Sequence, residues 1–381
     1  MMATSYELLW SDPVVIERNS YELPLLIDEN GNVVVEVSNW MRQLATTNKK
    51  PNTVAQYAST IMNFWNFISS IGVDWKDVFD EHLKVWRNLA RRRGNAMKTV
   101  NAKLLTVYAF YIWAQKKGLI YEVIGQPSIK RESPFQIEIT ISKKRGKSIS
   151  IGSDLLYRDL SRVKRPVPTQ RDMDSAYVEV AKVGDIEKVE RDVLFLRWGS
   201  EAGLRRAEIQ QLELTQISTI QEAEELQQSG EVKSLRVVGK GEKARLVPVN
   251  PDLLLATAEY IRYARALTLA KLSNPRRSKH VFISTTTGAT LSLRRISEIG
   301  SKALKVSNPE LSFHRTRARY ASRFCQVQFQ AELDRKGHLN DLGLHGIMLL
   351  LMQNLGHSDP KAWEAYVQLE LKMFIQANPE A

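Results

Sequence analysis

Apolar residues between Asn52 and Gly72 recur at the 3.6-residue spacing of one helix face. This spacing predicts a helix that Asn52 caps and Gly72 ends. The same pattern predicts a second long helix from about Met97 to Lys117. Because the aromatic residues share these stripes, they are interpreted as core rather than as base-stacking groups. The stripes are Val54, Tyr57, Ile61, Phe64, Trp65 and Ile68 in the first helix and Met97, Val100, Leu104, Val107, Tyr108 and Tyr111 in the second.

Length and composition restrict the class further. With 381 residues, 43% of them hydrophobic, the chain is long enough for two domains with separate cores. The single cysteine, Cys325, excludes the secreted, disulfide-stapled class. The longest nearly apolar run, 104–114, is much shorter than the roughly 20 residues of a membrane-spanning helix, and the first residues lack a signal-peptide pattern. We therefore expect a soluble, cytoplasmic protein without membrane contact.

Turn residues and prolines divide the sequence into four parts. Short apolar runs and turns predict a small hairpin or irregular arm over 1–37, and the helical bundle follows over 38–125. Prolines, glycines and basic residues mark 126–168 as a basic interdomain linker with some extended structure. Thr169 and Asp172 approximate a capping box that opens a second domain, 169–381.

The second domain is predicted to combine helices with one hairpin. Alternating residues at 235–238 and 244–248 flank a glycine-containing turn and predict two antiparallel strands. The predicted fold class is therefore mostly α with a small antiparallel sheet, an α+β arrangement. Helices are expected near 185–202, 205–213, 252–272, 293–305, 314–330, 344–355 and 360–375.

Positive charge is concentrated in the first domain. The formal net charge is +12, and residues 82–117 contain nine basic and no acidic side chains. Such closely spaced cations repel one another unless a polyanion offsets them, so DNA contact is favoured over a merely solvated face. The candidate contacts surround the turn that enters the second long helix: Arg91, Arg92, Arg93 and Lys98.

Several common kinds of catalytic site are not indicated. The six histidines lack the HExxH or paired-cysteine spacing of zinc sites. The sequence Gly239-Lys240-Gly241 lies between strand-like segments and lacks the GxxxxGK[ST] pattern of a nucleotide-binding loop, and no GxSxG elbow occurs. We therefore expect no metal and no other cofactor.

A set of basic and polar motifs follows one order along the second domain. The motifs are Gly203–Ile209, Lys240 at the hairpin tip, His314–Arg317, Leu355–His357 and Tyr366. In this order the chain resembles the tyrosine recombinase (phage integrase) family over 38–125 and 166–381. The resemblance implies a helical core-binding, DNA-binding bundle followed by a tyrosine-recombinase catalytic domain. It also implies DNA integration or recombination through a 3′-phosphotyrosyl intermediate, without metal or ATP.

The chemistry of phosphodiester cleavage suggests a role for each of four residues. Charge collects on the non-bridging oxygens of a phosphodiester in the transition state, and two guanidiniums, Arg205 and Arg317, can clamp them. A phenol is a weak nucleophile near neutral pH, but a cationic pocket favours its ionised form. Tyr366 is therefore the candidate nucleophile, and His314 can accept or share its proton.

Three further residues complete the candidate site. Lys240 on the hairpin can protonate the leaving 5′ oxygen as a general acid. His357, just before the expected cap of the tyrosine helix, can hydrogen-bond the same phosphate. Glu208, one turn after Arg205 on the same predicted helix, can orient nearby donors through charge-assisted bonds.

Each residue also has an ordinary explanation when it is considered alone. Arg205 can be a solvated helix arginine, Lys243 competes with Lys240 for the turn position, and the histidines can be capping or core residues. Tyr366 can pack in an amphipathic face. The occurrence of the whole set in one order is what favours catalysis.

The sequence departs from the usual family pattern in two intervals. The segment 326–346 looks like an insertion, and the interval from Arg205 to Lys240 is also long. Whether the tyrosine acts in cis or in trans, the target sequence and the biological task stay open at this stage.

The resemblance also implies partners. They are double-stranded DNA with inverted-repeat core sites, a homotetramer on two DNA sites, and accessory DNA-bending or directionality proteins, at a bacterial nucleoid in the cytoplasm. A C-terminal helix that docks on a neighbouring subunit would use Leu369, Leu371, Met373, Phe374 and Ile375. The alternatives are type IB topoisomerase-like relaxation of DNA and a non-catalytic DNA-binding regulator on the same scaffold.

Overall fold

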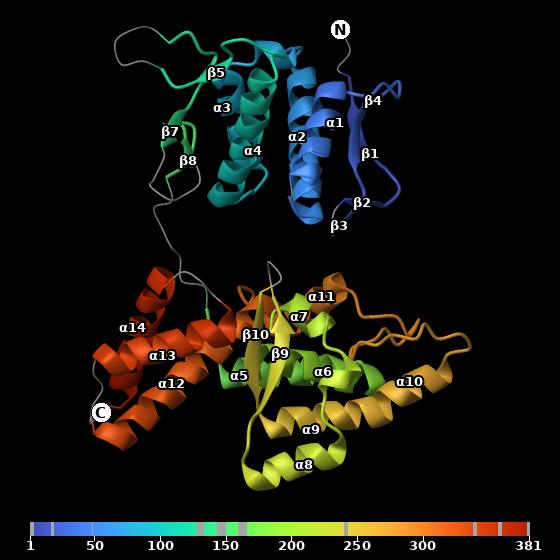
Figure 1. The fold of residues 1–381 in the computed structure, drawn as a ribbon, viewed down its shortest axis with the longest axis vertical. Coiled ribbons are helices and arrows are strands. Elements are labelled where there is room, and N and C mark those ends of the chain that lie inside the picture. The colour runs from blue at the N-terminus through green and yellow to red at the C-terminus, as the bar shows by residue number, and fades with distance from the viewer. Residues whose placement is uncertain are drawn as a thin grey trace. The chain divides into compact units, whose positions relative to one another are not determined.

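The computed structural model divides the chain into two compact units, Met1–Arg162 and Val163–Ala381 (Figure 1). Each unit has its own hydrophobic core and is described by itself. The residues that the structure describes are 4–16, 19–47, 49–127, 133–142, 150–158, 166–239, 243–337, 341–356 and 360–378.

Helices and short strand pairs form the first unit. Four of its helices pack around one core, and antiparallel strand pairs precede them. The helices are α1 (Val35–Thr46), α2 (Pro51–Ser70), α3 (Asp80–Arg92) and α4 (Met97–Lys116), with a 3-10 turn at Trp75–Asp77. The strands are β1 (Tyr6–Trp10) with β4 (Pro24–Asp28), and β2 (Val14–Ile16) with β3 (Asn19–Tyr21).

The two long helices predicted from apolar spacing are α2 and α4. Nearly all stripe positions are buried, and their rings contact one another, as where Trp65 and Phe110 lie 5.1 Å apart between centroids. The interpretation of these aromatics as core is confirmed. The predicted cap is wrong: α2 begins at Pro51 and Lys50 precedes it as cap. Proline at the first helical position has a suitable φ and no N–H to satisfy, so the helix starts before Asn52.

The N-terminal strands are part of the core of the first unit. Tyr21 and Leu26 are buried in the same cluster as α1, α2 and α4, and the Tyr21 hydroxyl donates to the Lys49 carbonyl at 2.6 Å. The described part of residues 1–37, expected as a hairpin or irregular arm, therefore contributes antiparallel strand pairs and the start of α1.

The region expected as a linker contains short extended pieces where it is described. These are β5 (Ile124–Gly125), paired in parallel with β6 (Ile137–Glu138), and β7 (Thr140–Ser142), paired in antiparallel with β8 (Ser150–Gly152). The basic stretch 143–147 lies outside the described residues.

The second unit contains helices around one hairpin and a separate group of three C-terminal helices (Figure 1). The hairpin strands are β9 (Lys233–Val238) and β10 (Ala244–Val249). The helices are α5 (Gln170–Ala181), α6 (Ile186–Glu201), α7 (Arg206–Gln210), α8 (Ile220–Ser229), α9 (Pro251–Tyr260), α10 (Ala266–Lys271), α11 (Leu293–Lys305), α12 (Thr316–Lys336), α13 (Asp341–Leu355) and α14 (Pro360–Ala377), with 3-10 turns at Leu214–Gln216 and Phe313–Arg315 and a π turn at Ile261–Arg265.

Two clusters of buried side chains support this unit. One joins α5–α9 and α11 to the hairpin, with Trp198 fully buried and its Nε1 donating to the Thr257 hydroxyl at 3.1 Å. The other joins α12, α13 and α14. The capping box of Thr169 and Asp172 is present at the start of α5, as predicted.

The two long intervals hold helical structure. The interval from Arg205 to Lys240 contains α8, which Thr219 caps and Gly230 ends with a φ of 71°. The segment 326–346 lengthens α12 and begins α13, and residues 338–340 lie outside the described part.

The predicted fold class, mostly α with small antiparallel sheets, is confirmed. The parallel pairing of β5 and β6 was not predicted. Within the described ranges, no helix combines the length and apolar character that crossing a membrane requires.

Gly203 occupies a tight contact between α6, α12 and α13. Its φ is +65°, and a Cβ there would lie 2.6 Å from Cδ1 of Tyr320 and 3.1 Å from Cδ2 of Leu355. A side chain at this position meets both a disfavoured backbone conformation and two packed neighbours.

We expect Gly203→Ala to lower the free energy of unfolding by more than the left-handed backbone alone requires. The backbone effect is about 1–2 kcal/mol, and overpacking adds roughly 1–3 kcal/mol. Urea unfolding measures the loss. Gly184→Ala is the matched control, because Gly184 has a φ of +71° and no atom within 4 Å of its Cβ position. Equal losses in the two variants would contradict the close packing at Gly203.

Candidate active site

Glu208 and Arg205 form the first half of a buried charge cluster. Arg205 is the residue that caps α7, so it precedes the helix instead of lying within it, and Glu208 is the third helical residue. The Arg205 amide donates to Glu208 Oε2, and its Nη1 donates to Glu208 Oε1, both at 2.8 Å. Glu208 is 3% exposed. Glu208 was predicted to orient nearby donors through charge-assisted bonds, and these contacts are bonds of that kind.

Arg245 is a second arginine on the same carboxylate, and it was not predicted from the sequence. Its Nη1 and Nη2 donate to Glu208 Oε1 and Oε2 at 2.7 and 2.8 Å, and its Nε donates to the Asn354 carbonyl at 2.8 Å. A signal was available, because Arg245 alternates with the buried Val247 and Val249 along β10. An arginine on the inward face of a strand requires an anionic partner.

Arg317, in the first turn of α12, is the third arginine. It is 6% exposed, its Nη1 and Nη2 donate to the carbonyls of Gly203 and Leu355, and Nη1 lies 3.8 Å from Glu208 Oε2. Burial and the nearby charge of Arg205 lower the pKa of Arg317 to about 9, while Glu208 opposes the shift. The Arg317 side chain therefore remains a cation near neutral pH.

Glu208 is ionised because of these arginines. Burial by itself raises the pKa of the carboxyl, but hydrogen bonds from Arg245 and Arg205 hold the pKa of Glu208 below its usual value. One negative charge thus lies among three positive ones. The net positive charge of this cluster suits an anion.

Four of the predicted catalytic residues line one cavity. Arg205, His314, Arg317 and Tyr366 surround a space of about 580 Å³. His314 is exposed on the 3-10 turn before α12. The apolar part of the lining includes Val167, Trp363, Leu369 and Met373.

Lys240 and His357 lie outside the described residues, but the glycines beside them are described. The Cβ position of Gly239 lies 3.1 Å from both Arg245 Nη1 and Glu208 Oε1. The Gly356 carbonyl accepts from Arg205 Nη2 at 3.4 Å. Gly239 and Gly356 themselves therefore lie at the edge of the arginine cluster.

Tyr366, on α14, has its hydroxyl engaged by the backbone. The hydroxyl donates to the Ala318 carbonyl at 3.1 Å, and the ring packs against Trp363 with 5.1 Å between centroids. Burial raises the pKa of the Tyr366 phenol well above its usual value, and the negative charge of Glu370 adds to the effect. Glu370 is 3% exposed and accepts from the Ser322 hydroxyl at 2.6 Å.

The candidate DNA contacts of the first unit differ in their surroundings. Arg91 donates to the Asn95 carbonyl and lies 5.9 Å from the centroid of the Tyr157 ring, so it also holds the turn together. Arg92, Arg93 and Lys98 are exposed. The last three are therefore accessible to a DNA backbone.

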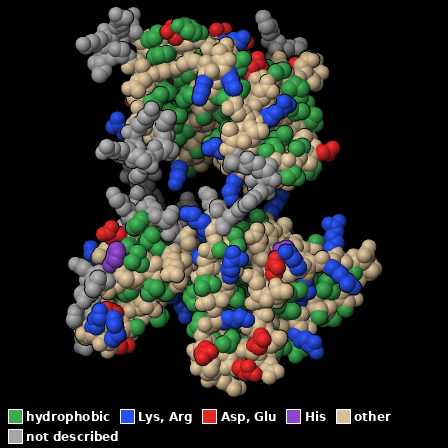
Figure 2. Space-filling model, viewed as in Figure 1, with side chains coloured by type: hydrophobic (Ala, Val, Ile, Leu, Met, Phe, Trp, Pro, Cys, Tyr) green, Lys and Arg blue, Asp and Glu red, His purple; other side chains and the backbone are tan. Residues whose placement is uncertain are grey.

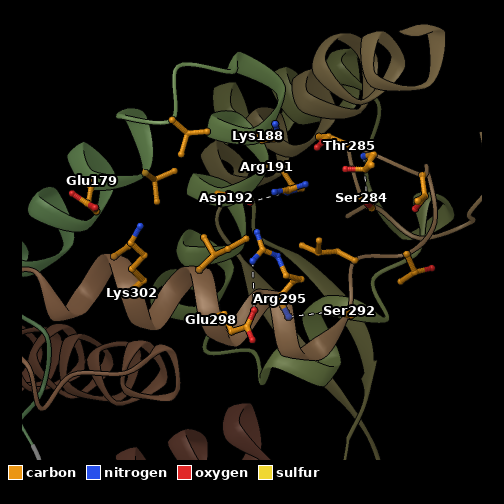
Figure 3. Close-up of a pocket in the computed structure, with 18 residues that line it drawn as sticks. Glu179, Lys188, Arg191, Asp192, Ser284, Thr285, Ser292, Arg295, Glu298 and Lys302 are labelled. Atoms are coloured by element: carbon orange, nitrogen blue, oxygen red, sulfur yellow. Dashed lines mark hydrogen bonds and ion pairs between the residues drawn. The ribbon is translucent and has the colours of Figure 1, made fainter. Parts of the chain in front are cut away.

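Figure 3 shows another cavity of the second unit, of about 530 Å³. Of the predicted catalytic residues that the structure describes, none lines it. Its basic side chains are largely paired: Arg191 contacts Asp192 at 2.7 Å, and Arg295 contacts Glu298 at 3.5 Å. Because none of the described candidate residues lines this cavity, it is not the candidate site.

The comparison with protein families agrees with this geometry. Residues 175–333 match the model of the phage integrase family. The chain carries a phage integrase domain. This domain includes Arg205, Glu208, Arg245, His314 and Arg317 and ends within α12.

The similarity to known proteins extends beyond the integrase domain. The chain is 24% identical to tyrosine recombinase XerC of Corynebacterium glutamicum over 300 residues, which cover 78% of this chain and 77% of XerC.

Solved structures of related enzymes share the fold. The XerH recombinase in a post-cleavage complex with a palindromic difH substrate has a TM-score of 0.57 at 13% identity, over 90% of this chain and 86% of XerH. A lambda integrase dimer bound to a COC′ core site has a TM-score of 0.52 at 13% identity, over 87% of this chain and 76% of that one. The predicted tyrosine recombinase family and the predicted enzyme class, a tyrosine-type site-specific recombinase, are confirmed.

We expect Tyr366 to ionise later than an ordinary tyrosine in a pH titration. Its pKa is raised above the usual value of 10.0, so at higher pH the folded protein keeps a proton that the unfolded chain loses. The stability that this group contributes is therefore present below pH 10 and declines as the pH rises above it. The difference in phenolate absorbance between the wild type and Tyr366→Phe isolates the step.

Glu370→Gln removes the nearby negative charge and should move this step to lower pH. A Tyr366 step at the ordinary tyrosine pKa in the wild type would contradict the described burial.

Proposed function

We propose that this protein cleaves and rejoins DNA through a covalent 3′-phosphotyrosyl intermediate formed by Tyr366, without metal or ATP. Its family acts in site-specific DNA recombination. The observation that carries the proposal is that Arg205, His314, Arg317 and Tyr366 line one cavity. A nucleophile, a proton acceptor and two forked cations are the groups that phosphodiester cleavage by a phenol requires.

The arginines have the charge that the transition state needs. Arg205 and Arg317 would donate to the two non-bridging oxygens of the scissile phosphate, and Glu208 limits their mutual repulsion. The Tyr366 oxygen attacks phosphorus, and the bond to the 5′ oxygen breaks. The proton of Tyr366 passes to a base, for which His314 is the candidate.

Lys240 and His357 complete the proposal. Lys240 would protonate the departing 5′ oxygen, and His357 would hydrogen-bond the phosphate. The phosphotyrosyl link keeps the energy of the broken ester, so attack by a 5′ hydroxyl of a partner strand re-forms a diester and frees the tyrosine.

The proposed partner is double-stranded DNA with inverted-repeat core sites. The solved XerH and lambda integrase structures are complexes with DNA sites, which supports this choice. The first unit would act as the core-binding domain, over 38–125, and residues 169–381 as the catalytic domain. Lys and Arg side chains are spread over the face of each unit that Figure 2 shows. Bacterial DNA in the cytoplasm is the proposed place of action.

A homotetramer on two DNA sites is the proposed assembly, with accessory DNA-bending or directionality proteins as further partners. Met373 and Ile375 on α14 are 52% and 44% exposed and offer apolar surface to a neighbouring subunit. Phe374 is unsuited to this contact, because it is buried in the core of its own unit.

The first test is covalent capture on a nicked duplex that carries the recombination site. We expect the wild type to form an adduct that survives denaturation and Tyr366→Phe to form none, because the phenyl ring has no nucleophile. Tyr320→Phe tests a rival phenol, whose hydroxyl accepts from Asn354 at 3.2 Å. Tyr263→Phe, at a 63% exposed position, is the control. Both of these variants should keep the adduct.

Three results would count against the proposal. An adduct that persists in Tyr366→Phe would assign the nucleophile elsewhere. Relaxation of plasmids without a specific site would indicate topoisomerase-like activity instead. Salt-sensitive DNA binding with no adduct on genuine sites would indicate a non-catalytic regulator.

The second test concerns the basic turn of the first unit. Each phosphate that a variant no longer neutralises should decrease the slope of log affinity against log salt by about 0.9. We therefore expect Arg92→Gln, Arg93→Gln and Lys98→Gln to flatten the slope in titrations of duplex binding. Lys182→Gln, which changes a lysine paired with Glu179 in the second unit, is the control and should leave the slope unchanged. Unchanged slopes in all three variants would remove this turn from the proposed DNA interface.

A further inference from the structure

Arg245 connects three segments of the second unit through one side chain. It lies on β10, its side chain is 7% exposed, and its two terminal nitrogens bind both oxygens of Glu208. Its Nε donates to the Asn354 carbonyl near the end of α13. One guanidinium thus joins the hairpin, α7 and α13.

These contacts depend on the shape of the guanidinium group. Two parallel hydrogen bonds to one carboxylate and a third from Nε require a planar fork, which the ammonium of lysine lacks. The contacts are also buried, because the Glu208 side chain is 2% exposed. A buried ion pair that loses one partner leaves an uncompensated charge, so the remaining groups must move toward it.

The nearest groups that could move are the two proposed clamp arginines. Arg205 Nη1 already donates to Glu208 Oε1, and Arg317 Nη1 lies 3.8 Å from Oε2. Among the described ion pairs of Glu208, only those with Arg205 and Arg317 remain when Arg245 is removed. They would be drawn to Glu208 and away from a phosphate.

Two close backbone approaches also depend on Arg245. The Cβ position of Gly239 lies 3.1 Å from Arg245 Nη1, and that of Gly356 lies 3.0 Å from Arg245 Cδ. Both glycines let the main chain pack directly on this arginine. The side chain therefore occupies a fixed place between the hairpin and the end of α13.

We infer that Arg245 is a positioning residue for DNA cleavage, which holds Glu208 so that Arg205 and Arg317 can clamp the scissile phosphate. This role rests on the proposed function. Arg245 would act through Glu208, and it is not among the residues that line the cavity with Tyr366.

The test compares cleavage of two nicked duplexes by Arg245→Lys. We expect adduct formation on ordinary DNA to slow by about 100-fold, the loss typical of a small misplacement of a catalytic group. The second duplex carries a methylphosphonate at the scissile position, which replaces a charged non-bridging oxygen by a methyl group. The two clamp arginines act mainly by stabilising the charge on the non-bridging oxygens, and the methylphosphonate carries less of it. On this duplex the slowing caused by Arg245→Lys should therefore be less than about 10-fold.

A structural role alone predicts different results. Arg236→Lys is the matched control, because Arg236 is an exposed arginine on the paired strand of the same hairpin and should cleave both duplexes as the wild type does. Thermal unfolding and non-covalent duplex binding of Arg245→Lys show whether the fold is kept. Undiminished cleavage of ordinary DNA by Arg245→Lys, or an equal defect on both duplexes, would overturn the inference.

A double-variant comparison examines the route through Glu208. If Arg245 acts by holding this carboxylate, Arg245→Met combined with Glu208→Gln should cleave no more slowly than the slower single variant. Defects that multiply in the double variant would overturn the route. Absence of an adduct in the wild type would instead refute the proposed function, so the two failures are distinguishable.

Discussion

The buried carboxylate of Glu208 is the interaction on which the basic site depends. Three guanidiniums that each lie within 4 Å of this carboxylate would repel one another strongly in a buried place, and the one anion between them makes the arrangement tolerable. The remaining excess of positive charge is not a defect of the fold. Under the proposed mechanism, the negative charge of an incoming phosphodiester would offset this excess.

The position of this cluster is set by packing. Gly203, in a left-handed conformation after α6, brings its carbonyl to Arg317, while Arg317 also binds the Leu355 carbonyl at the end of α13. One arginine thus connects the core of α5–α9 and α11 to the group α12–α14. The residue that would hold a phosphate is therefore also a structural link between two packed clusters.

Helices that follow from a local spacing of apolar residues could be predicted from the sequence. A contact between residues far apart in the chain could not. Helices such as α4 and α11 follow from the spacing of apolar residues, and the order of basic motifs led to Arg205, Arg317 and Tyr366. Arg245 was missed because its partner Glu208 lies 37 residues earlier in the chain and only folding brings the two together. Asn52 was wrongly predicted as the cap of α2, because proline prefers the first helical position and Pro51 therefore starts the helix earlier.

Under the proposed mechanism, the surroundings of Tyr366 limit when cleavage can occur. Burial and Glu370 both favour the neutral phenol, and the hydroxyl is bound to the Ala318 carbonyl, so without DNA this residue is a poor nucleophile. The arginines that could stabilise its charge belong to the same cavity. Under the proposed mechanism, the Tyr366 hydroxyl must therefore break its hydrogen bond to the Ala318 carbonyl of α12 before it attacks. A phosphate held by Arg205 and Arg317 would lie at the start of that helix, so substrate binding and release of the nucleophile would act on one element. Such an arrangement ties the reactive state of the tyrosine to the presence of its substrate.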